Sequence, residues 1–467
     1  MEQDPRIVRL RNATVMAAML TLAMPIIAQS LFQVLIGTVD LKMVGVLGSD
    51  AIAAVGMGRQ VIMIIMILVL AISTGATAIV ARNVGSGDQR QAARAAGNAF
   101  RLVLLFSAIM TPVGLLTAPH ILVLLGASPE VMAFGLDYMR IFYFSVVFFL
   151  SNFMARSVFQ GAGNTKTPLI IDIVMNLVNV GANYLLIFGI WIFPEMGVAG
   201  AALGSAIARF VGSLLGWGAL LSGRYGLRLT VADLVGWDGS GMKRILTIGI
   251  PAAFQGMARN ISNIALVAIL ARTVAGMAAI SAFTVGMNIT QYALMPGLAV
   301  GTAAAALTGI NLGAKDARRA EASGWAAAWF GAAVMGFFAA ISFIFAPWLL
   351  AFFSDDAEMI RVGVPFIRII AVAEPFHAIG IILSRSMQGA GYTYKPFLIT
   401  VVSWLFVRVP MAVGLAFFAD LQTTGVWIAI AASLLLSGSW AMIEYRKGRW
   451  KNVSIAKDRV AAVAGEV

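Results

Sequence analysis

The chain has 467 residues, of which 60% are hydrophobic and only 12% are charged, and its mean hydropathy is +0.90. This composition excludes a soluble domain of this length and indicates an integral membrane protein. With no cysteine and two histidines, a disulfide framework, a thiolate metal site and a histidine-rich metal cluster are also excluded.

Twelve apolar segments follow one another along the chain. Each is long enough to cross the ~30 Å hydrocarbon core of a bilayer as a helix, which needs about 20 residues. Little sequence remains for a soluble domain, so we predict an all-α polytopic membrane protein. We expect the transmembrane helices at 13–41, 50–80, 92–118, 132–160, 166–190, 197–221, 243–271, 278–309, 321–346, 360–388, 396–418 and 424–444.

The net charge of +12 suggests nucleic acid at first, but the basic residues gather at alternate ends of the segments. Arg6, Arg9 and Arg11 precede the first segment, and the connections after every second segment and the C-terminal tail are also basic. By the positive-inside rule both termini are cytoplasmic, which requires an even number of spans. We therefore expect a multi-pass protein of the cell (inner or plasma) membrane. Its partner is the lipid bilayer, and we expect it to bind no nucleic acid.

The chain repeats itself. The sequence QGAGNTKTP at 160–168 recurs as QGAGYTYKP at 388–396, an offset of 228 residues, and nearer the start the offset becomes 226 and relates Pro25 to Pro251. Such a register indicates two parallel six-helix halves, an arrangement typical of transporters. We predict an N-terminal lobe at 1–221, a cytoplasmic linker at 222–242, a C-terminal lobe at 243–446 and a basic cytoplasmic tail at 447–467.

The first apolar segment ends in an acid, Asp40. On a helix Gln29, Gln33 and Asp40 share one face, and Pro25 below them removes one intrahelical hydrogen bond and makes a hinge plausible. Ionisable groups inside a membrane segment are costly and usually face a bundle interior or a water-filled cavity. Asp40 is therefore the first functional candidate, against the alternative of an acid at the membrane interface near Lys42.

The fifth segment carries a polar stripe along one helical face. Its members are Asp172, Asn176, Asn179 and Asn183. The acid in the first segment and the three asparagines have no polar counterparts in the second half, where the repeat places Leu266, Trp404, Val407 and Met411. The polarity belongs to one half only. The asparagines could also join helices by amide hydrogen bonds, and for Asp172 we expect a structural role.

These features together resemble the multidrug and toxic compound extrusion (MATE) family along nearly the whole chain. The resemblance rests on the twelve spans in two parallel halves, the proline-containing first helix ending in Asp40 before VGVLGSDAIAAVG, and a QGxGxTxxP-like turn in each half. It implies an antiporter that expels amphipathic, often cationic organic compounds in exchange for protons or sodium ions. It also implies a cation site in the N-terminal lobe.

The resemblance assigns roles by position. Asp40 matches the acid of the N-lobe, Asn179 matches its asparagine partner, Asn183 stands where some members have a second aspartate, and Ser205 matches a hydroxyl of the same site. Members of the NorM-type branch carry a glutamate and an aspartate where this chain has Arg259 and His377. The pattern is therefore more similar to the DinF-type branch.

The predicted mechanism is proton exchange at Asp40. Burial among amides favours the protonated form of a carboxyl group, so we expect protonation of Asp40 and drug binding to oppose each other. Sodium remains an alternative, since Asp40, Asn179, Asn183, Gln33 and Ser205 offer oxygen or amide ligands for a cation. We expect no cofactor, a small-molecule organic substrate, a coupling proton and a monomeric protein.

The substrate wall is less clearly marked. Adaptable apolar and amide side chains in the first, fourth, fifth and eighth segments suit varied ligands; most such residues in a membrane chain are core or lipid-facing. The candidates are Gln29, Phe148, Phe149, Asn152, Met154, Asn176, Met287, Asn288, Gln291 and Met295. In the second half, Glu374 and His377 share a helical face, and with Arg259 they are predicted to form a polar cluster with either a structural or a substrate-binding role.

Three other functions fit the sequence less well. A flippase for lipid-linked oligosaccharides is the nearest, but Asp40 and the paired turns favour an exporter. A channel lacks support, because nothing resembles a pore loop. An enzyme is least expected, since the sequence has no metal-binding His/Glu motif and no GxSxG serine. A P-loop is absent as well, so an ion gradient must drive transport.

Overall fold

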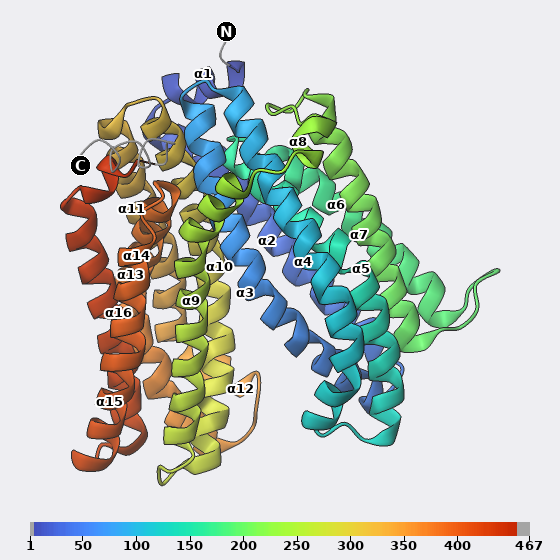
Figure 1. Cartoon of the computed structure of the whole chain (residues 1–467). Coiled ribbons are helices and arrows are strands. Elements are labelled where there is room, and N and C mark those ends of the chain that lie inside the picture. The colour runs from blue at the N-terminus through green and yellow to red at the C-terminus, as the bar shows by residue number, and fades with distance from the viewer. Residues whose placement is uncertain (1–3, 455–467) are drawn as a thin grey trace, which may run out of the picture. The chain divides into compact units, whose positions relative to one another are not determined.

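The computed structural model describes residues 4–454, apart from the side chains at positions 41, 59 and 64, and these residues are almost entirely helical (Figure 1). The first half contains α1 (Pro5–Asn12), α2 (Val15–Gly45), α3 (Ser49–Gly85), α4 (Gln89–Leu124), α5 (Pro129–Gly161), α6 (Lys166–Phe188), α7 (Gly197–Ser222) and α8 (Val231–Val235). The second half contains α9 (Gly239–Leu270), α10 (Gly276–Gly313), α11 (Ala317–Ile344), α12 (Ala346–Ala351), α13 (Ala357–Gly389), α14 (Tyr394–Val401), the π-helix η1 (Val402–Val407), α15 (Arg408–Val413), the π-helix η2 (Gly414–Phe418), α16 (Gln422–Arg446) and the 3₁₀-helix η3 (Arg449–Asn452).

Each predicted span corresponds to a helical segment. Among the described residues, eleven are long and apolar enough to cross a membrane, counting the continuous stretch Tyr394–Phe418 as one. The twelfth, α9, is a helix of 32 residues, but Lys243, Arg244 and Arg259 make it too polar to meet that requirement. Most helices extend beyond the apolar segments that predicted them, because polar residues continue the helix outside the hydrocarbon core.

The described residues form two compact units. Unit 1 contains residues 4–8 and 24–250, and unit 2 contains 9–23 and 251–454. The chain changes unit three times, and two of these changes lie next to a proline inside a long helix, Pro25 in α2 and Pro251 in α9. These limits differ from the predicted lobes, because the first turns of α2 belong to unit 2 and the first turns of α9 to unit 1. Each proline interrupts the helical hydrogen-bond ladder at the point where the chain leaves one unit for the other.

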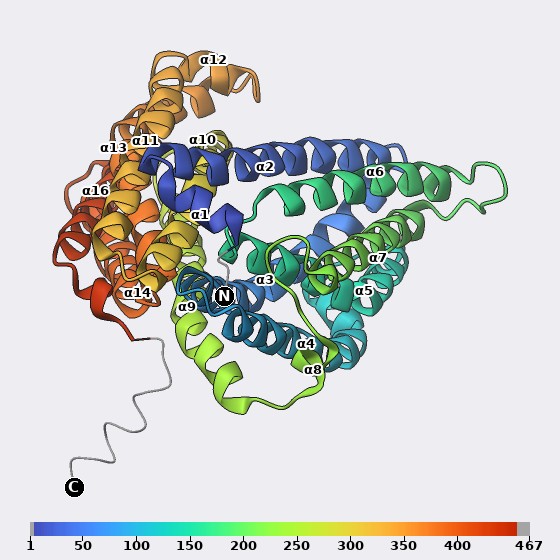
Figure 2. The ribbon, with the colours of Figure 1, turned by 90° about the horizontal axis from the view of Figure 1, so that it is seen from above.

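In unit 1, helices α3 to α7 pack against one another as a bundle (Figures 1 and 2). Glycines permit the closest approaches: a Cβ on Gly249 at the start of α9 would lie 1.7 Å from the Ala71 carbonyl oxygen, and one on Gly75 would lie 2.1 Å from that of Ile245. The connection between α6 and α7 extends away from this bundle (Figure 2).

The repeat is visible in the way that helices begin. Asp88 and Asp316, related by the offset of 228, cap α4 and α11 by accepting a hydrogen bond from the third residue beyond. Ser128 and Asp356 cap α5 and α13 with the same offset. Equivalent caps start equivalent helices, since each satisfies a backbone N–H that has no partner within the helix.

The region predicted as a cytoplasmic linker is attached to unit 1. Its short helix α8 has a capping box formed by Thr230 and Asp233, and the Arg101 guanidinium on α4 donates to the Asp233 carbonyl oxygen at 2.7 Å. The predicted tail likewise begins in the fold, because Trp450 is fully buried and its indole donates to the Tyr445 carbonyl oxygen at 2.9 Å. Residues 455–467 of the predicted tail lie outside the described residues.

Candidate functional site

Asp40 on α2 is held by amides of α6. The Asn183 side-chain nitrogen donates to Asp40 Oδ1 at 2.9 Å. The amide of Asn179, one turn earlier, has two orientations that differ in which atom faces the carboxylate. With its nitrogen toward Asp40 it donates at 3.0 Å to Oδ1 and 3.3 Å to Oδ2, and its oxygen accepts a hydrogen bond from Ser205 Oγ at 3.1 Å. Three elements, α2, α6 and α7, therefore meet at one carboxylate.

A close helix contact makes this arrangement possible. A Cβ on Gly204 of α7 would lie 2.2 Å from Asn183 Oδ1, and one on Gly200 would lie 2.5 Å from the Leu186 carbonyl oxygen. Glycine at both positions allows α7 to approach α6 and bring Ser205 beside Asn179. A small apolar cluster that includes Val44, Val55 and Ile187 packs beyond the site at this end of the unit.

The site has no counterpart in unit 2. Leu266, which replaces Asp40 in the repeat, is fully buried in the main apolar cluster of unit 2, and Trp404, which replaces Asn176, belongs to the same cluster. The predicted asymmetry between the halves is therefore present as packing: unit 1 has a partly buried carboxylate held by amides where unit 2 buries a leucine.

A second acid on α6 forms a separate cluster. Asp172 is buried, pairs with the Arg156 guanidinium at 2.6 Å and accepts a short hydrogen bond from the Gln29 amide. The repeat preserves the last contact in unit 2, where Gln255 donates to Thr400 Oγ1 at 2.7 Å. A contact present in both halves connects the first and fifth helices of each, so the Gln29–Asp172 pair serves the architecture.

The other α6 asparagine lies between the two clusters. Asn176 is buried, and among the described residues its side-chain nitrogen has no hydrogen-bond partner. The Asn183 side-chain oxygen, Oδ1, is also buried and has no hydrogen-bond partner among the described residues. Buried polar atoms of this kind are the usual places for water or a ligand.

Gln33 does not join the site. Its side chain is exposed, and it forms no hydrogen bond with the described residues around Asp40. Gln33 lies one turn from Gln29 on α2, but Gln29 is buried against Asp172 whereas Gln33 is exposed. Helical periodicity predicts that the two share a face, but it does not predict which of them is buried.

The predicted substrate-lining residues are scattered. In unit 1 Phe148, Phe149 and Asn152 are partly buried and Met154 is fully buried, whereas in unit 2 Met287 and Met295 are partly buried and Asn288 and Gln291 are exposed. The Asn152 amide donates to the Arg209 carbonyl oxygen at 2.7 Å and to Ser213 Oγ at 3.1 Å, so it joins α5 to α7. Full burial leaves Met154 without a surface to offer a ligand.

The predicted cluster in unit 2 is only partly formed. His377 Nδ1 and Glu374 Oε2, both on α13, are 3.6 Å apart, and the imidazole lies 6.2 Å from the Trp404 ring. Arg259 forms no ion pair with Glu374 in the described part of the chain, and the charged group with which it interacts is Arg385. The place of Arg259 in this cluster therefore stays a prediction.

Arg209 on α7 was not predicted. Its guanidinium carbon lies 5.4 Å from the Phe142 ring centroid and 5.2 Å from that of Phe149, and it interacts electrostatically with Tyr138 and Asp40. Among the described residues no carboxylate comes within ion-pair distance of it. The signal was present in the sequence, because a lone cation inside an apolar segment is itself a candidate for function.

The described residues contain no group of three or more His, Asp or Glu side chains that could hold a metal ion. The oxygens near Asp40 are its own carboxylate, the Asn183 and Asn179 amides and the Ser205 hydroxyl. Such a set can accept a proton or a hard monovalent cation.

Comparison with known proteins places these features in a family. The family model MatE matches residues 25–185 and 251–413, two stretches with the offset of 226 found in the sequence. The chain is 26% identical over 447 residues to the probable multidrug resistance protein NorM of Thermotoga maritima, covering 95% of each chain. It is 23% identical over 437 residues to the multidrug resistance protein MdtK of Proteus mirabilis, covering 90% of this chain and 93% of that protein.

Among solved structures, the fold is similar to that of a MOP superfamily transporter from Pyrococcus furiosus described as having a binding pocket of reverse polarity. The TM-score is 0.87 at 21% sequence identity, and the match covers 97% of this chain and 100% of that chain.

Proposed function

Because this chain belongs to the MatE family, we propose that it is a secondary antiporter that exports amphipathic, cationic organic compounds in exchange for protons. One observation carries the proposal: in unit 1 the partly buried Asp40 carboxylate faces two amides, one of which also contacts a hydroxyl, where unit 2 has apolar residues. The names of the NorM and MdtK relatives support export of drugs.

The Asn179 amide links the charge of Asp40 to its surroundings. When Asp40 is ionised, the amide nitrogen faces it and donates. When Asp40 carries a proton, the better partner at the same 3.0 Å position is the amide oxygen, which accepts the O–H. The amide then turns, and its nitrogen instead faces Ser205 Oγ on α7. Protonation of a residue on α2 thus changes a contact between α6 and α7.

Exchange follows if proton and drug favour different states of Asp40. A cationic group is attracted by the ionised carboxylate and loses that attraction when the carboxylate is protonated. Pro25, which lies where α2 passes from one unit to the other, gives the helix a place to bend. Proton entry from outside would release the drug, and proton loss would prepare the site for the next one.

Arg209 widens the range of cargo. Its guanidinium, in the same unit as Asp40, attracts an acceptor group on a compound whose cationic group is held by Asp40. A molecule with an amine for Asp40, an anionic or carbonyl group for Arg209, and a ring for Phe142 and Phe149 meets all three. We therefore extend the proposal to zwitterionic aromatic compounds.

Sodium is the second candidate, favoured by the unpartnered Asn183 oxygen beside the Asp40 carboxylate. A sodium ion would draw the oxygens of Asn183, Asn179 and Ser205 to one point. We favour the proton because the site has a single acid and the Arg259 and His377 positions supply no further carboxylate. For the same reason we place the chain nearer the DinF-type branch than the NorM-type branch.

The remaining parts of the proposal concern setting. The alternating basic connections support residence in the inner or plasma membrane with both termini cytoplasmic. We further propose that the protein has no cofactor and no enzymatic activity and is a monomer. A flippase for lipid-linked oligosaccharides and a channel are the alternatives. A counterflow measurement separates exchange from channel leak.

The test is drug-driven proton movement in vesicles that contain the full chain. Replacing Asp40→Asn removes the titrating group but keeps its shape, so drug addition should release no protons and a proton gradient should not drive uptake. Asp137→Asn is the matched control, because Asp137 is an exposed acid paired with Arg140, and it should leave exchange intact. Unchanged coupling in the Asp40 variant would remove that residue from the mechanism. Transport driven by sodium alone, with the proton gradient collapsed, would favour the sodium alternative.

A further inference from the structure

Unit 1 has a cavity of about 410 Å³ between α6 and α7, away from Asp40. Its walls are apolar and include Ile170 and Val174 on α6 and Leu214 on α7; its polar end is formed by Thr167, Arg224 and Tyr225. The glycines show where the two helices touch and where they separate. They touch at Gly200 and Gly204, whereas a Cβ on Gly218, in the cavity wall, would meet nothing within 4 Å.

The walls of the cavity carry exposed aliphatic side chains. Ile170 and Leu214 are 61% and 57% exposed, although both lie on helices that are long and apolar enough to cross a membrane. Exposed aliphatic side chains on such helices contact acyl chains, because lipid is the apolar solvent available to them. The groove therefore runs along the membrane-spanning surface of the unit rather than into its interior.

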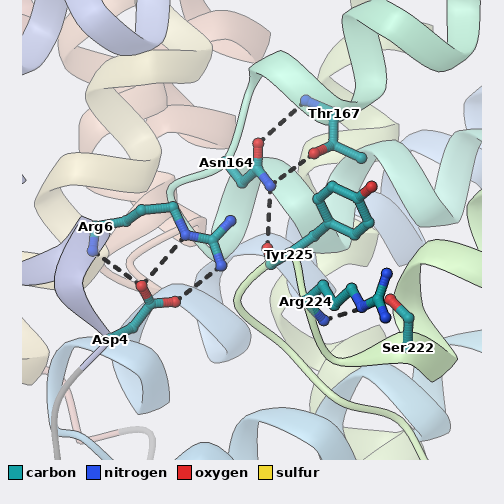
Figure 3. Close-up of polar contacts among 7 residues, drawn as sticks. All are labelled: Asp4, Arg6, Asn164, Thr167, Ser222, Arg224 and Tyr225. Carbon is teal, nitrogen blue, oxygen red and sulfur yellow. Dashed lines mark hydrogen bonds and ion pairs between the residues drawn. The ribbon is translucent and has the colours of Figure 1, made fainter.

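The polar end of the groove carries unpaired positive charge. Arg224 is exposed and, among the described residues, its guanidinium forms no hydrogen bond or ion pair. Lys166, at the start of α6, and Arg228 are also exposed. The nearby acid, Asp4, is occupied, because Arg6 binds both of its oxygens at 3.2 and 3.1 Å (Figure 3).

The loop that presents Arg224 is fixed in place. The Asn164 amide donates to the Tyr225 carbonyl oxygen at 3.0 Å and to Thr167 Oγ1 at 2.8 Å, and the Arg224 backbone N–H donates to Ser222 Oγ at 3.3 Å (Figure 3). This network joins the end of α7 to the turn before α6. Ordering the loop in this way lowers the entropy lost when its side chains bind a ligand.

We propose that the groove binds one anionic phospholipid, with an acyl chain between α6 and α7 and the headgroup phosphate at Arg224. The apolar walls of the groove match the acyl chain of a phospholipid, and the positive charge at its polar end matches the phosphate. Arg224 also selects the headgroup, because a choline or ethanolamine group brings a positive charge toward it and a glycerol headgroup does not. Lys166, which precedes the lining residue Thr167, and Arg228, whose side chain lies against Gly223, add to the positive charge near this end.

The lipid would act as a clamp on the helices that carry the Asp40 site. Asn179 and Asn183 lie on α6 and Ser205 on α7, and these helices are in contact at one end and separated by the groove at the other. A bound acyl chain fills the separated end and stabilises unit 1. This inference needs only a membrane-embedded chain and stands whether or not Asp40 couples transport to protons.

The experiment is a lipid titration of the purified full chain in detergent, read by native mass spectrometry. Phosphatidylglycerol and phosphatidylcholine with identical acyl chains are compared for the first bound lipid. We expect tighter binding of phosphatidylglycerol. Arg224→Gln should weaken it about fivefold, as removal of one interfacial cation implies, and should leave phosphatidylcholine unchanged. The matched control is Arg272→Gln, an exposed arginine of unit 2, which should have no effect.

A second pair of variants tests the apolar part. Gly218→Leu places a side chain in the groove and should weaken both lipids, whereas Gly181→Leu, at a site that also has nothing within 4 Å, should weaken neither. Thermal unfolding shows whether each variant folds. If Gly218→Leu does not fold, the variant at the exposed Arg224 carries the test. Equal effects of the two arginine variants would indicate diffuse surface charge and overturn the proposal. Wild-type binding that inorganic phosphate abolishes, or that Gly218→Leu leaves intact, would overturn it as well.

Discussion

Replacing Gly204→Ala tests the geometry of the Asp40 site without removing any of its polar groups. The new Cβ would lie 2.2 Å from Asn183 Oδ1 and 2.9 Å from the Asn183 backbone nitrogen. Relief of this steric clash requires the Asn183 side chain or the helix to move by on the order of 1 Å. The hydrogen bond from Asn183 to Asp40, now 2.9 Å, would then be too long to persist.

The expected magnitude follows from two contributions. Overpacking of a well-packed contact costs about 1–3 kcal/mol, and a hydrogen bond to a charged group contributes about 1.5–3 kcal/mol; relaxation makes the sum smaller than its parts. Gly181→Ala is the control, because its Cβ meets nothing within 4 Å and alanine stabilises a helix by about 0.5–1 kcal/mol relative to glycine.

The assays are thermal unfolding in detergent and drug-driven proton release in vesicles. Gly204→Ala should lower the melting temperature and weaken coupling, while Gly181→Ala should do neither. If both variants unfold and exchange alike, α6 and α7 are not in the close contact on which the site depends, and the reasoning fails.

Three further predictions concern other charged residues. Arg156→Gln leaves the buried carboxylate of Asp172 without its counter-ion and should destabilise the protein by about 3–5 kcal/mol, measured by thermal unfolding; the double variant with Asp172→Asn should recover much of this loss. A hydrogen bond from Asn98 is the main cause that lowers the pKa of Asp238, in the linker, from 3.8 to about 2. The stability from this carboxylate is therefore complete above about pH 4 and is lost as the pH falls toward 2; unfolding curves over that range should lose this slope in Asp238→Asn. Arg209→Gln should reduce efflux of a zwitterionic aromatic dye more than that of its cationic ester, and equal effects on both would exclude a role in selecting charge.

Much of the architecture could be predicted from the sequence because the bilayer imposes it. Lipid offers no partner for a backbone N–H or C=O, so each long apolar segment must be a helix, and the repeated QGAG turns fixed the relation between the halves. The same comparison isolated Asp40, Asn179 and Asn183, which have apolar counterparts in the second half. These residues meet in the structure because the spacing that aligned Asn179 with Asn183 also brings them to one side of α6.

Other features required the tertiary structure, since they depend on how helices approach one another. Periodicity related Gln33 to Gln29 but did not determine that Gln29 is buried and Gln33 is exposed. The contacts of Arg209 with the rings of Phe142 and Phe149 are likewise known only from the structure. The sequence by itself determined the helices, their repeat and the half that holds the acid. Only packing decided which side chains surround that acid, because contacts between helices depend on close approaches, such as the one at Gly204, that the pattern along a single helix does not contain.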